Sequence, residues 1–262
     1  MVDMLTAHVL FFALLGQDGA VSSSDPAKAA VALQQAIRRE PDKESNYTEL
    51  GNLLLRTQNF PQAAGVLEAA RSRFPNSAQP VLSLGVAYYG LRRFPDAVEA
   101  FLAAGRLAPD AEQPIAFLSR LQEHWNDRKP EIESLLNAYS TAHPRDPLAL
   151  YSLGKLRADA ALLRRSLALN PGFADAHFEL AAVLESQRDW PAAIASYQSA
   201  ARLSPKNPAP HYRLARLYAR SGDKVKAEQE RSLHEKLAAA ERAEVDRRQA
   251  ATKHLAFGKE EK

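Results

Sequence analysis

The chain has 262 residues, of which 46% are hydrophobic and 25% charged, a composition that excludes an intrinsically disordered protein. Its 34 basic and 31 acidic residues leave a formal charge of +3, too small an excess for a concentrated phosphate-binding surface, so we expect no nucleic acid partner. Because the chain contains no cysteine, it has no disulfide, no thiolate nucleophile and no cysteine-ligated zinc.

Residues 1–24 contain an apolar stretch that ends at Leu15. Its length suits a signal peptide, but no Lys or Arg precedes it and Asp18 fits poorly beside a cleavage site near Ala20. Two interpretations stay open: a signal peptide, which predicts a periplasmic or secreted protein, and an N-terminal helix that caps the fold of a cytoplasmic one. A bilayer span takes about 20 apolar residues, so we expect no stable membrane span here.

One pattern of small and large residues then recurs along the chain. Its clearest copy consists of Leu84-Gly85, Tyr88, Ala97, Phe101, Ala104 and Pro109. A step of 34 residues towards the N-terminus meets Leu50-Gly51, Leu54, Ala63, Leu67, Ala70 and Pro75. Further copies begin at Leu180-Ala181 and Leu214-Ala215. Each copy carries two apolar stripes at helical spacing, which predicts a pair of helices.

Prolines punctuate each copy. Pro61, Pro95 and Pro191 predict the start of a second helix, because proline is tolerated in the first turn, where its missing N–H would have no intrahelical partner. A second set predicts the end of that helix: Pro75, Pro109, Pro144, Pro171 and Pro205. Small residues such as Gly85 let the two helices approach closely, and Phe101 fills the space beside them. Such a hairpin buries its apolar face only by stacking on a neighbour.

This pattern resembles that of the tetratricopeptide repeat (TPR) family, whose consensus of Leu-Gly, Tyr, Ala, Phe, Ala and Pro is matched in full from Leu84 to Pro109. The resemblance covers residues 25–234 and implies an all-α fold, a right-handed α-solenoid of antiparallel helix-turn-helix repeats. The early Trp of the family is replaced here by Tyr47, Val81, Ile115, Leu150, His177 and His211. Most of these residues are bulky, so the fold expectation stands.

The spacing predicts the repeat boundaries: a half repeat at 25–41, repeats near 44–77, 78–111, 112–146, 147–173 (shortened), 174–207 and 208–234, and a charged C-terminal helix and tail at 235–262. Residues 112–146 hold one extra residue, with Glu131 where an alanine is expected. The shortened repeat lacks about two helical turns. There we expect Asp159 to cap the second helix and the superhelical path to change; one continuous helix over 148–170 is the alternative.

The two ends of the array are also predicted. Residues 25–41 fit a second helix alone, whose partner would be the apolar N-terminal segment. The long C-terminal helix is expected to be the polar cap that a repeat array needs. A coiled-coil or partner-binding helix is the alternative, for which Leu233, Leu237 and Ala240 offer only a thin apolar stripe.

No residue constellation points to catalysis. His177 and His211 lie 34 residues apart in the same repeat slot, which indicates a packing role. His234 lacks the second histidine of a metalloprotease helix, and the sequence holds neither a glycine-rich phosphate loop nor a nucleophile elbow. We therefore expect a non-catalytic protein with no cofactor and no metal site.

The resemblance also implies where a partner binds, because in this family the first helices line a concave face that holds extended peptides or a helix. The slots two before and two after each Leu of the Leu-Gly pair project to that face, and Tyr89 and Arg220 lie one turn further along it. The predicted peptide-binding residues are Asn52, Leu82, Tyr89, Arg120, Tyr151, Lys155, Phe178, Tyr212 and Arg216. The Lys and Asn carboxylate clamp of chaperone-binding members is matched by Asn52 alone, so chaperone tails are not expected.

These features predict a protein-protein interaction scaffold that binds a peptide or helical segment of a partner. Its aromatic wall with basic residues towards the C-terminal half favours a hydrophobic, acid-bearing peptide. Two alternatives stay open. One is a structural protein that self-associates through the C-terminal helix or the shortened repeat, and the other is an accessory subunit of an enzyme or secretion complex. The sequence leaves the oligomeric state open.

Overall fold

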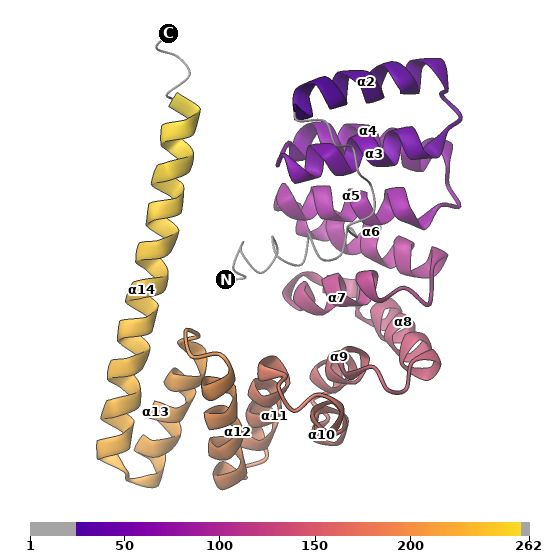
Figure 1. Cartoon of the computed structure of the whole chain (residues 1–262). Helices are drawn as coiled ribbons and strands as arrows, with labels where there is room; N and C mark the ends of the chain where they lie inside the picture. Colours follow the sequence, from indigo (N-terminus) through magenta and orange to yellow (C-terminus); the bar gives the residue numbers. More distant parts are fainter. Residues whose placement is uncertain (1–24, 258–262) are drawn as a thin grey trace. The chain divides into compact units, whose positions relative to one another are not determined.

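The computed structural model describes residues 25–257, which form helices joined by short turns, with no strand in that range (Figure 1). The all-α prediction is therefore confirmed. The chain divides into two compact units between Pro144 and Arg145, and each unit is described by itself. The expectations for residues 1–24 lie outside the described residues. No helix within the described range is long and apolar enough to cross a membrane.

The first unit stacks helical hairpins one on another (Figure 1). The lone helix α2 packs against α3, and the pairs α3/α4 and α5/α6 follow. A third pair, α7 and α8, is separated by two 3-10 turns. The bounds are α2 (Pro26–Arg39), α3 (Glu44–Arg56), α4 (Phe60–Arg73), α5 (Ala78–Gly90), α6 (Phe94–Leu107), α7 (Glu112–Arg120), η1 (Gln122–His124), η2 (Asn126–Arg128) and α8 (Lys129–Ala142).

The second unit contains three more hairpins. Their bounds are α9 (Pro147–Arg157), α10 (Ala160–Leu169), α11 (Ala174–Ser186), α12 (Trp190–Leu203), α13 (Ala209–Ser221) and α14 (Lys224–Phe257). The last helix runs without a break across the predicted boundary at residues 234 and 235. The second helix of the last repeat and the C-terminal helix are therefore one element of 34 residues.

The helix starts follow the prolines. Pro61, Pro95 and Pro191 occupy the second positions of α4, α6 and α12, as predicted. The turn before each of these helices contains a residue in the left-handed conformation that is not glycine: Gln58, Arg92 and Arg188, with φ of 59°, 59° and 65°. The hairpins thus share one turn geometry.

Close packing explains the Leu-Gly pair of the repeat. Phe101 of α6 is fully buried, and a Cβ atom built on Gly85 of α5 would lie 2.6 Å from its ring. In the preceding repeat, a Cβ atom on Gly51 would lie 2.5 Å from Leu67. Both distances are too short for a real Cβ contact, so with Leu67 and Phe101 placed as they are, glycine is the residue that fits at Gly51 and Gly85.

The extra residue in the third repeat shifts its pattern by one position. Ile132 is fully buried in the place expected for the alanine, while Glu131 forms ion pairs with Arg106 and Arg128 at the surface. After the shortened α7, the buried Trp125 donates a hydrogen bond from Nε1 to the Leu118 carbonyl oxygen at 2.9 Å. An aromatic side chain therefore fills space left by the shortened first helix.

The shortened fourth repeat is a hairpin, so the alternative of one continuous helix over 148–170 is wrong. Ala158 turns the chain in the left-handed conformation, with φ of 51°. Asp159 then caps α10, as predicted, because its carboxylate accepts hydrogen bonds from the Ala161 and Leu162 amides at 2.8 and 3.2 Å. The change of superhelical path stays a prediction.

The two histidines of the shared repeat slot have different surroundings. His211 of α13 is 8% exposed, and its Nδ1 lies 2.6 Å from Oε2 of Glu230 on α14. His177 of α11 is half-buried, with Nε2 3.1 Å from the Pro171 carbonyl oxygen. His211 thus faces its partner helix, whereas His177 bonds to the loop ahead of its own helix.

Candidate peptide-binding surface

All nine predicted binding residues lie on the first helices of the hairpins. We call the surface formed by α3, α5 and α7 the first-helix face of the first unit, and that formed by α9, α11 and α13 the first-helix face of the second unit. Asn52, Leu82, Tyr89 and Arg120 belong to the former. Tyr151, Lys155, Phe178, Tyr212 and Arg216 belong to the latter.

In the first unit, two of the four predicted residues are already engaged inside the unit, one by a hydrogen bond and one by burial. The Asn52 side-chain oxygen accepts a hydrogen bond from the Ser83 hydroxyl of the next repeat at 2.9 Å. Leu82 is 9% exposed and forms part of the core. The hydrogen bond of Asn52 therefore joins α3 to α5, which is the role expected of a residue that contacts the neighbouring repeat.

Tyr89 and Arg120 form a half-buried edge of the same unit. The Tyr89 ring lies 5.6 Å from that of Phe94 and 6.5 Å from that of Phe117. Burial raises the pKa of the Tyr89 phenol above its ordinary value, and the positive charge of Arg120 partly opposes that rise. The Arg120 guanidinium donates to the Ala116 carbonyl oxygen at 2.7 Å. This edge is aromatic with one cationic group.

In the second unit, the first predicted cation is already paired. Lys155 lies 2.9 Å from a carboxylate oxygen of Glu179 on α11, and its ammonium is 5.9 Å from the ring centre of Tyr151. Tyr151 is buried against Phe173, with ring centres 4.7 Å apart. The charge of Lys155 is thus balanced within the unit.

Phe178 belongs to a similar internal cluster. Its ring meets the edge of Tyr197 at a centroid distance of 5.3 Å. The Tyr197 hydroxyl donates to Glu185 at 3.0 Å, and burial together with the Glu185 charge raises the pKa of that phenol. Arg213 of α13 lies 3.7 Å from the same carboxylate. The polar groups of Tyr197, Glu185 and Arg213 are thus paired within the unit.

The last first helix, α13, presents a different surface. Tyr212 is 48% exposed, and the Arg216 guanidinium lies 5.8 Å from its ring centre. One turn further, the exposed Arg220 lies 4.8 Å from the ring centre of Trp190. Within the described range, neither arginine forms an ion pair with a carboxylate. We call Tyr212, Arg216 and Arg220 the α13 surface.

Sequence reasoning missed two contributors. Glu179, the counter-ion of Lys155, directly follows the predicted Phe178, and a search for opposite charges in neighbouring repeats would have found it. Trp190 supports Arg220 from the turn sequence RDWP, where a different aromatic stands in the earlier repeats. Its indole Nε1 is buried without a hydrogen-bond partner among the described residues. In the described part of the chain, no group of three or more His, Asp or Glu side chains is arranged to hold a metal ion.

Comparisons with known proteins agree on the architecture. A tetratricopeptide repeat family model matches residues 48–112 and 148–208. Among solved structures, the chain is similar to YrrB, described as a TPR protein with an unusual peptide-binding site, at 17% identity and a TM-score of 0.55, covering 67% of this chain and 94% of that one. It is also similar to PilF of Pseudomonas aeruginosa, at 21% identity and a TM-score of 0.56, covering 71% and 88%.

A third similar structure is a chain of the APC/C hetero-tetramer Cut9-Hcn1, at 16% identity and a TM-score of 0.59. The match covers 82% of this chain and 44% of that one, so this chain spans less than half of its length. No curated protein sequence matches. TPR proteins are generally non-catalytic, and their fold supports a role as a protein-protein interaction scaffold. The family match, the spacing of 34 residues and the stacked hairpins together show that this chain belongs to the tetratricopeptide repeat family.

Proposed function

We propose that this protein captures an extended peptide or a helical segment of a partner on the first-helix face of its second unit. The observation that carries the proposal is the α13 surface, where the exposed Tyr212 stands beside Arg216 and Arg220. By contrast, Lys155 on the same face is paired with Glu179 inside the unit. Within residues 25–257, Arg216 and Arg220 contact aromatic rings and form no ion pair, so both can bind a carboxylate of a partner.

The chemistry of this surface defines the ligand. An exposed aromatic ring offers contact area at low entropic cost, because a tyrosine side chain has few rotatable bonds. Guanidinium groups bind carboxylates through paired, charge-assisted hydrogen bonds. Arg216 and Arg220 are one helical turn apart, about 6 Å along the axis. A peptide that carries an apolar or aromatic residue next to one or two acidic residues fits this arrangement.

The test is a selection of random peptides on the immobilised full chain, followed by affinity measurements on the enriched peptides by fluorescence anisotropy. We expect acidic residues next to aromatic ones to be enriched. The double variant Arg216→Ala, Arg220→Ala should lower the affinity at least about tenfold, since each charge-assisted hydrogen bond is worth about 1.5–3 kcal/mol. Tyr212→Ala should weaken the same peptides.

The matched control removes two positive charges elsewhere. Arg202 and Lys206 are exposed at the end of α12 and in the loop that follows it, so Arg202→Ala, Lys206→Ala changes the net charge equally without altering the first-helix face. Equal losses in both double variants would mean that the net charge attracts the peptides. Full affinity in all variants would move the binding site away from α13.

A further inference from the structure

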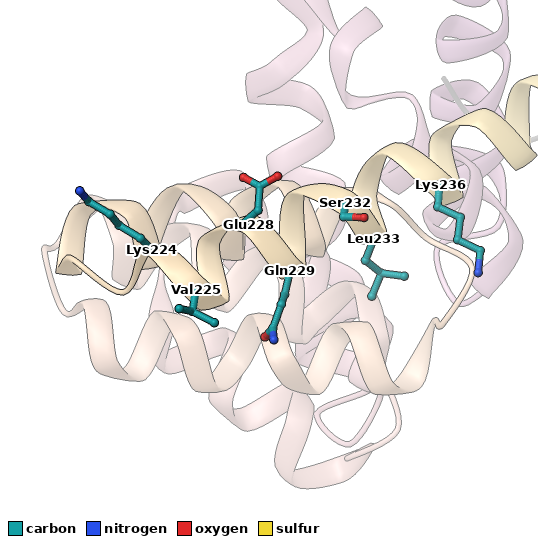
Figure 2. A pocket seen from close by; sticks show the side chains of 7 residues that line it. All are labelled: Lys224, Val225, Glu228, Gln229, Ser232, Leu233 and Lys236. Atoms are coloured by element: carbon teal, nitrogen blue, oxygen red, sulfur yellow. The ribbon is translucent and has the colours of Figure 1, made fainter.

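The first part of α14 carries two rows of side chains that line a shallow hollow. Figure 2 shows the seven lining residues, all of which belong to α14. Residues four positions apart on a helix lie in one row. One row holds Lys224, Glu228, Ser232 and Lys236, and the neighbouring row holds Val225, Gln229 and Leu233. The hollow is the groove between two adjacent rows of one helix, and we call these seven residues the α14 groove.

Two large apolar side chains of this groove are exposed. Val225 is 69% exposed, the highest value among the large hydrophobic residues in the described part of the chain, and Leu233 is 39% exposed. The equivalent rows of earlier second helices hold Pro191, Ala195 and Ser199 in α12, and Pro61, Gly65 and Ala69 in α4. The last helix thus departs from its own repeat pattern by carrying bulky apolar residues where the earlier helices carry proline or small residues.

A further hairpin stacked as in the repeats does not account for these exposed residues. On α12 the next hairpin meets the other row, where the Arg220 guanidinium of α13 lies 4.8 Å from the ring centre of Trp190. The position 34 residues after Trp190 is Lys224, which is polar and exposed. A partner that buries Val225 and Leu233 therefore docks in a register different from that of a TPR hairpin.

The shape of the α14 groove favours a helix as its occupant. An extended peptide needs partners for its backbone N–H and C=O groups, and α14 offers none, because its own backbone groups bond within the helix. A second helix satisfies its own backbone, and a ridge of its side chains fits into the groove between two rows of a neighbour. Val225 and Leu233 are eight positions, about 12 Å, apart. Partner residues seven or eight positions apart on one face therefore reach both.

The charges of the groove define the partner further. Lys224 and Lys236 stand at its two ends, about 18 Å apart along the axis. Among the residues that the structure describes, neither ammonium group forms an ion pair, whereas the one acid of the groove, Glu228, pairs with Arg231 at 2.8 Å. The groove therefore offers one positive charge at each end to the acidic residues of a partner.

We propose that the α14 groove binds an amphipathic helix of a partner protein. One face of that helix carries two large apolar residues seven or eight positions apart, with an acidic residue beyond each of them. The apolar pair covers Val225 and Leu233, and the acids meet Lys224 and Lys236. The groove shares no residue with the α13 surface, so this binding does not depend on the proposed capture of a peptide there.

The experiment selects helical peptides from a displayed random library on the immobilised full chain. The library is first depleted on the double variant Val225→Gln, Leu233→Gln, so the peptides that remain are those that need the groove. Glutamine removes the apolar surface and is a good helix former, and circular dichroism checks that helix content is kept. We expect the enriched peptides to carry the apolar pair with flanking acids. An absence of enrichment, or enriched peptides without this pattern, would overturn the proposal.

Affinities of the enriched peptides are then measured by fluorescence anisotropy. The variant Val225→Gln, Leu233→Gln should bind them at least about tenfold more weakly than the wild type, because the apolar contact is lost. The variant Lys224→Glu, Lys236→Glu should also bind them more weakly, and it should prefer derivatives in which lysine replaces the flanking acids. If this variant keeps the preference of the wild type for the acidic peptides, the assigned charge pairing is wrong.

Two control variants separate the groove from other surfaces. Val31→Gln, Leu169→Gln also removes two exposed apolar residues, and Arg216→Ala, Arg220→Ala removes the cations of the α13 surface. Both variants should bind the enriched peptides like the wild type. An equal loss in the first would mean that any exposed apolar surface attracts the peptides, and a loss in the second would place them on the α13 surface. Either loss would overturn the proposal.

A second copy of this chain is the other occupant that the experiment decides on. Sedimentation velocity measures the mass of the wild type without peptide over a range of concentrations. If the wild type self-associates and the variant Val225→Gln, Leu233→Gln does not, the groove is an interface between copies and the proposal is overturned. A wild type that stays monomeric, or self-association that the variant keeps, leaves the groove to the partner helix.

Discussion

At the scale of single residues, the hairpin turns use a backbone conformation that most side chains disfavour. A residue other than glycine in the left-handed region costs about 1–2 kcal/mol, yet Gln58, Arg92, Ala158 and Arg188 all adopt it. The hydrogen bonds around the turn offset that cost. At Arg92, for example, the amide donates to Tyr89 and the next amide, of Arg93, donates to Tyr88. No glycine marks these positions in the sequence, so only the helix bounds located them.

The buried phenol of Tyr88 makes the stability of the fold sensitive to alkaline pH. It is 6% exposed, and its hydroxyl donates to Glu68 at 2.6 Å. Burial, assisted by the hydrogen bond to Glu68, raises its pKa to about 12 from an ordinary value of 10.0. Because the pKa is raised in the folded state, its contribution to stability is complete below pH 10 and is lost as the pH rises towards 12.

Tyr88→Phe removes this titration. We expect the free energy of unfolding of the variant, measured by urea denaturation, to fall less steeply between pH 10 and 12 than that of the wild type. The phenol of Tyr197 is present in both proteins, so the difference between the two curves isolates Tyr88. Parallel curves would contradict the assigned pKa.

At the scale of an element, two glycines in helices have opposite roles. Gly85 of α5 faces the fully buried Phe101, and a Cβ atom on Gly85 would lie 2.6 Å from that ring. Gly65 of α4 is exposed, with no atom within 4 Å of the position that a Cβ would take. Gly85→Ala should therefore lower the free energy of unfolding by about 1–3 kcal/mol through overpacking. Gly65→Ala should raise it by about 0.5–1 kcal/mol, because alanine favours a helix.

Chemical denaturation of the two variants side by side checks these signs. The substitution is the same and both sites are helical, so helix propensity alone would stabilise both proteins. A Gly85→Ala variant more stable than the wild type would show that α5 and α6 can move apart without a loss of stability. Packing would then not explain the glycine of the Leu-Gly pair.

The irregular elements show how far sequence patterns reach. The helix starts and the Asp159 cap were predictable, because proline and aspartate act through the local backbone. The third repeat was recognised as irregular, but the early end of α7 and the burial of Trp125 were not foreseen. The chain can accommodate one extra residue at any point between the two apolar stripes of a repeat. The packing of the side chains decides which point it is.

At the scale of the whole molecule, the second unit has a core of its own. Leu163, Tyr197 and Leu217 belong to one buried cluster that joins α10, α12 and α13. In a repeat protein each hairpin is stabilised mainly by its nearest neighbours. We therefore expect a fragment of residues 145–262 to keep its helix content and to melt cooperatively, as followed by circular dichroism.

A shorter fragment of residues 160–262 provides the comparison. It lacks α9, whose Gly154 packs against Leu163 of α10, so α10 loses its hairpin partner. This fragment should melt at a lower temperature than the longer one. An unfolded longer fragment would mean that the second unit needs residues before 145 to fold.

The candidate site was less predictable than the fold. The repeat register placed all nine residues on first helices, as the slots required. It did not distinguish Leu82, which is buried, from Tyr212, which is exposed, because both occupy the same slot in different repeats. Nor did it foresee that Glu179 neutralises Lys155. Which side chains remain available depends on contacts between repeats, and a periodic pattern does not encode those contacts.

The outward face of α14, where polar residues lie beside the exposed Val225 and Leu233, defines a place where the array can be lengthened by protein engineering. Lys224, Glu228 and Ser232 stand where α12 carries Trp190, Ile194 and Gln198. These three residues could be exchanged for their counterparts, and the part of α14 after His234 could be replaced with a new hairpin. The altered α14 would then allow further repeats to be grafted on. The hairpin design itself imposes no upper limit on the number of repeats, because each hairpin is stabilised mainly by its nearest neighbours.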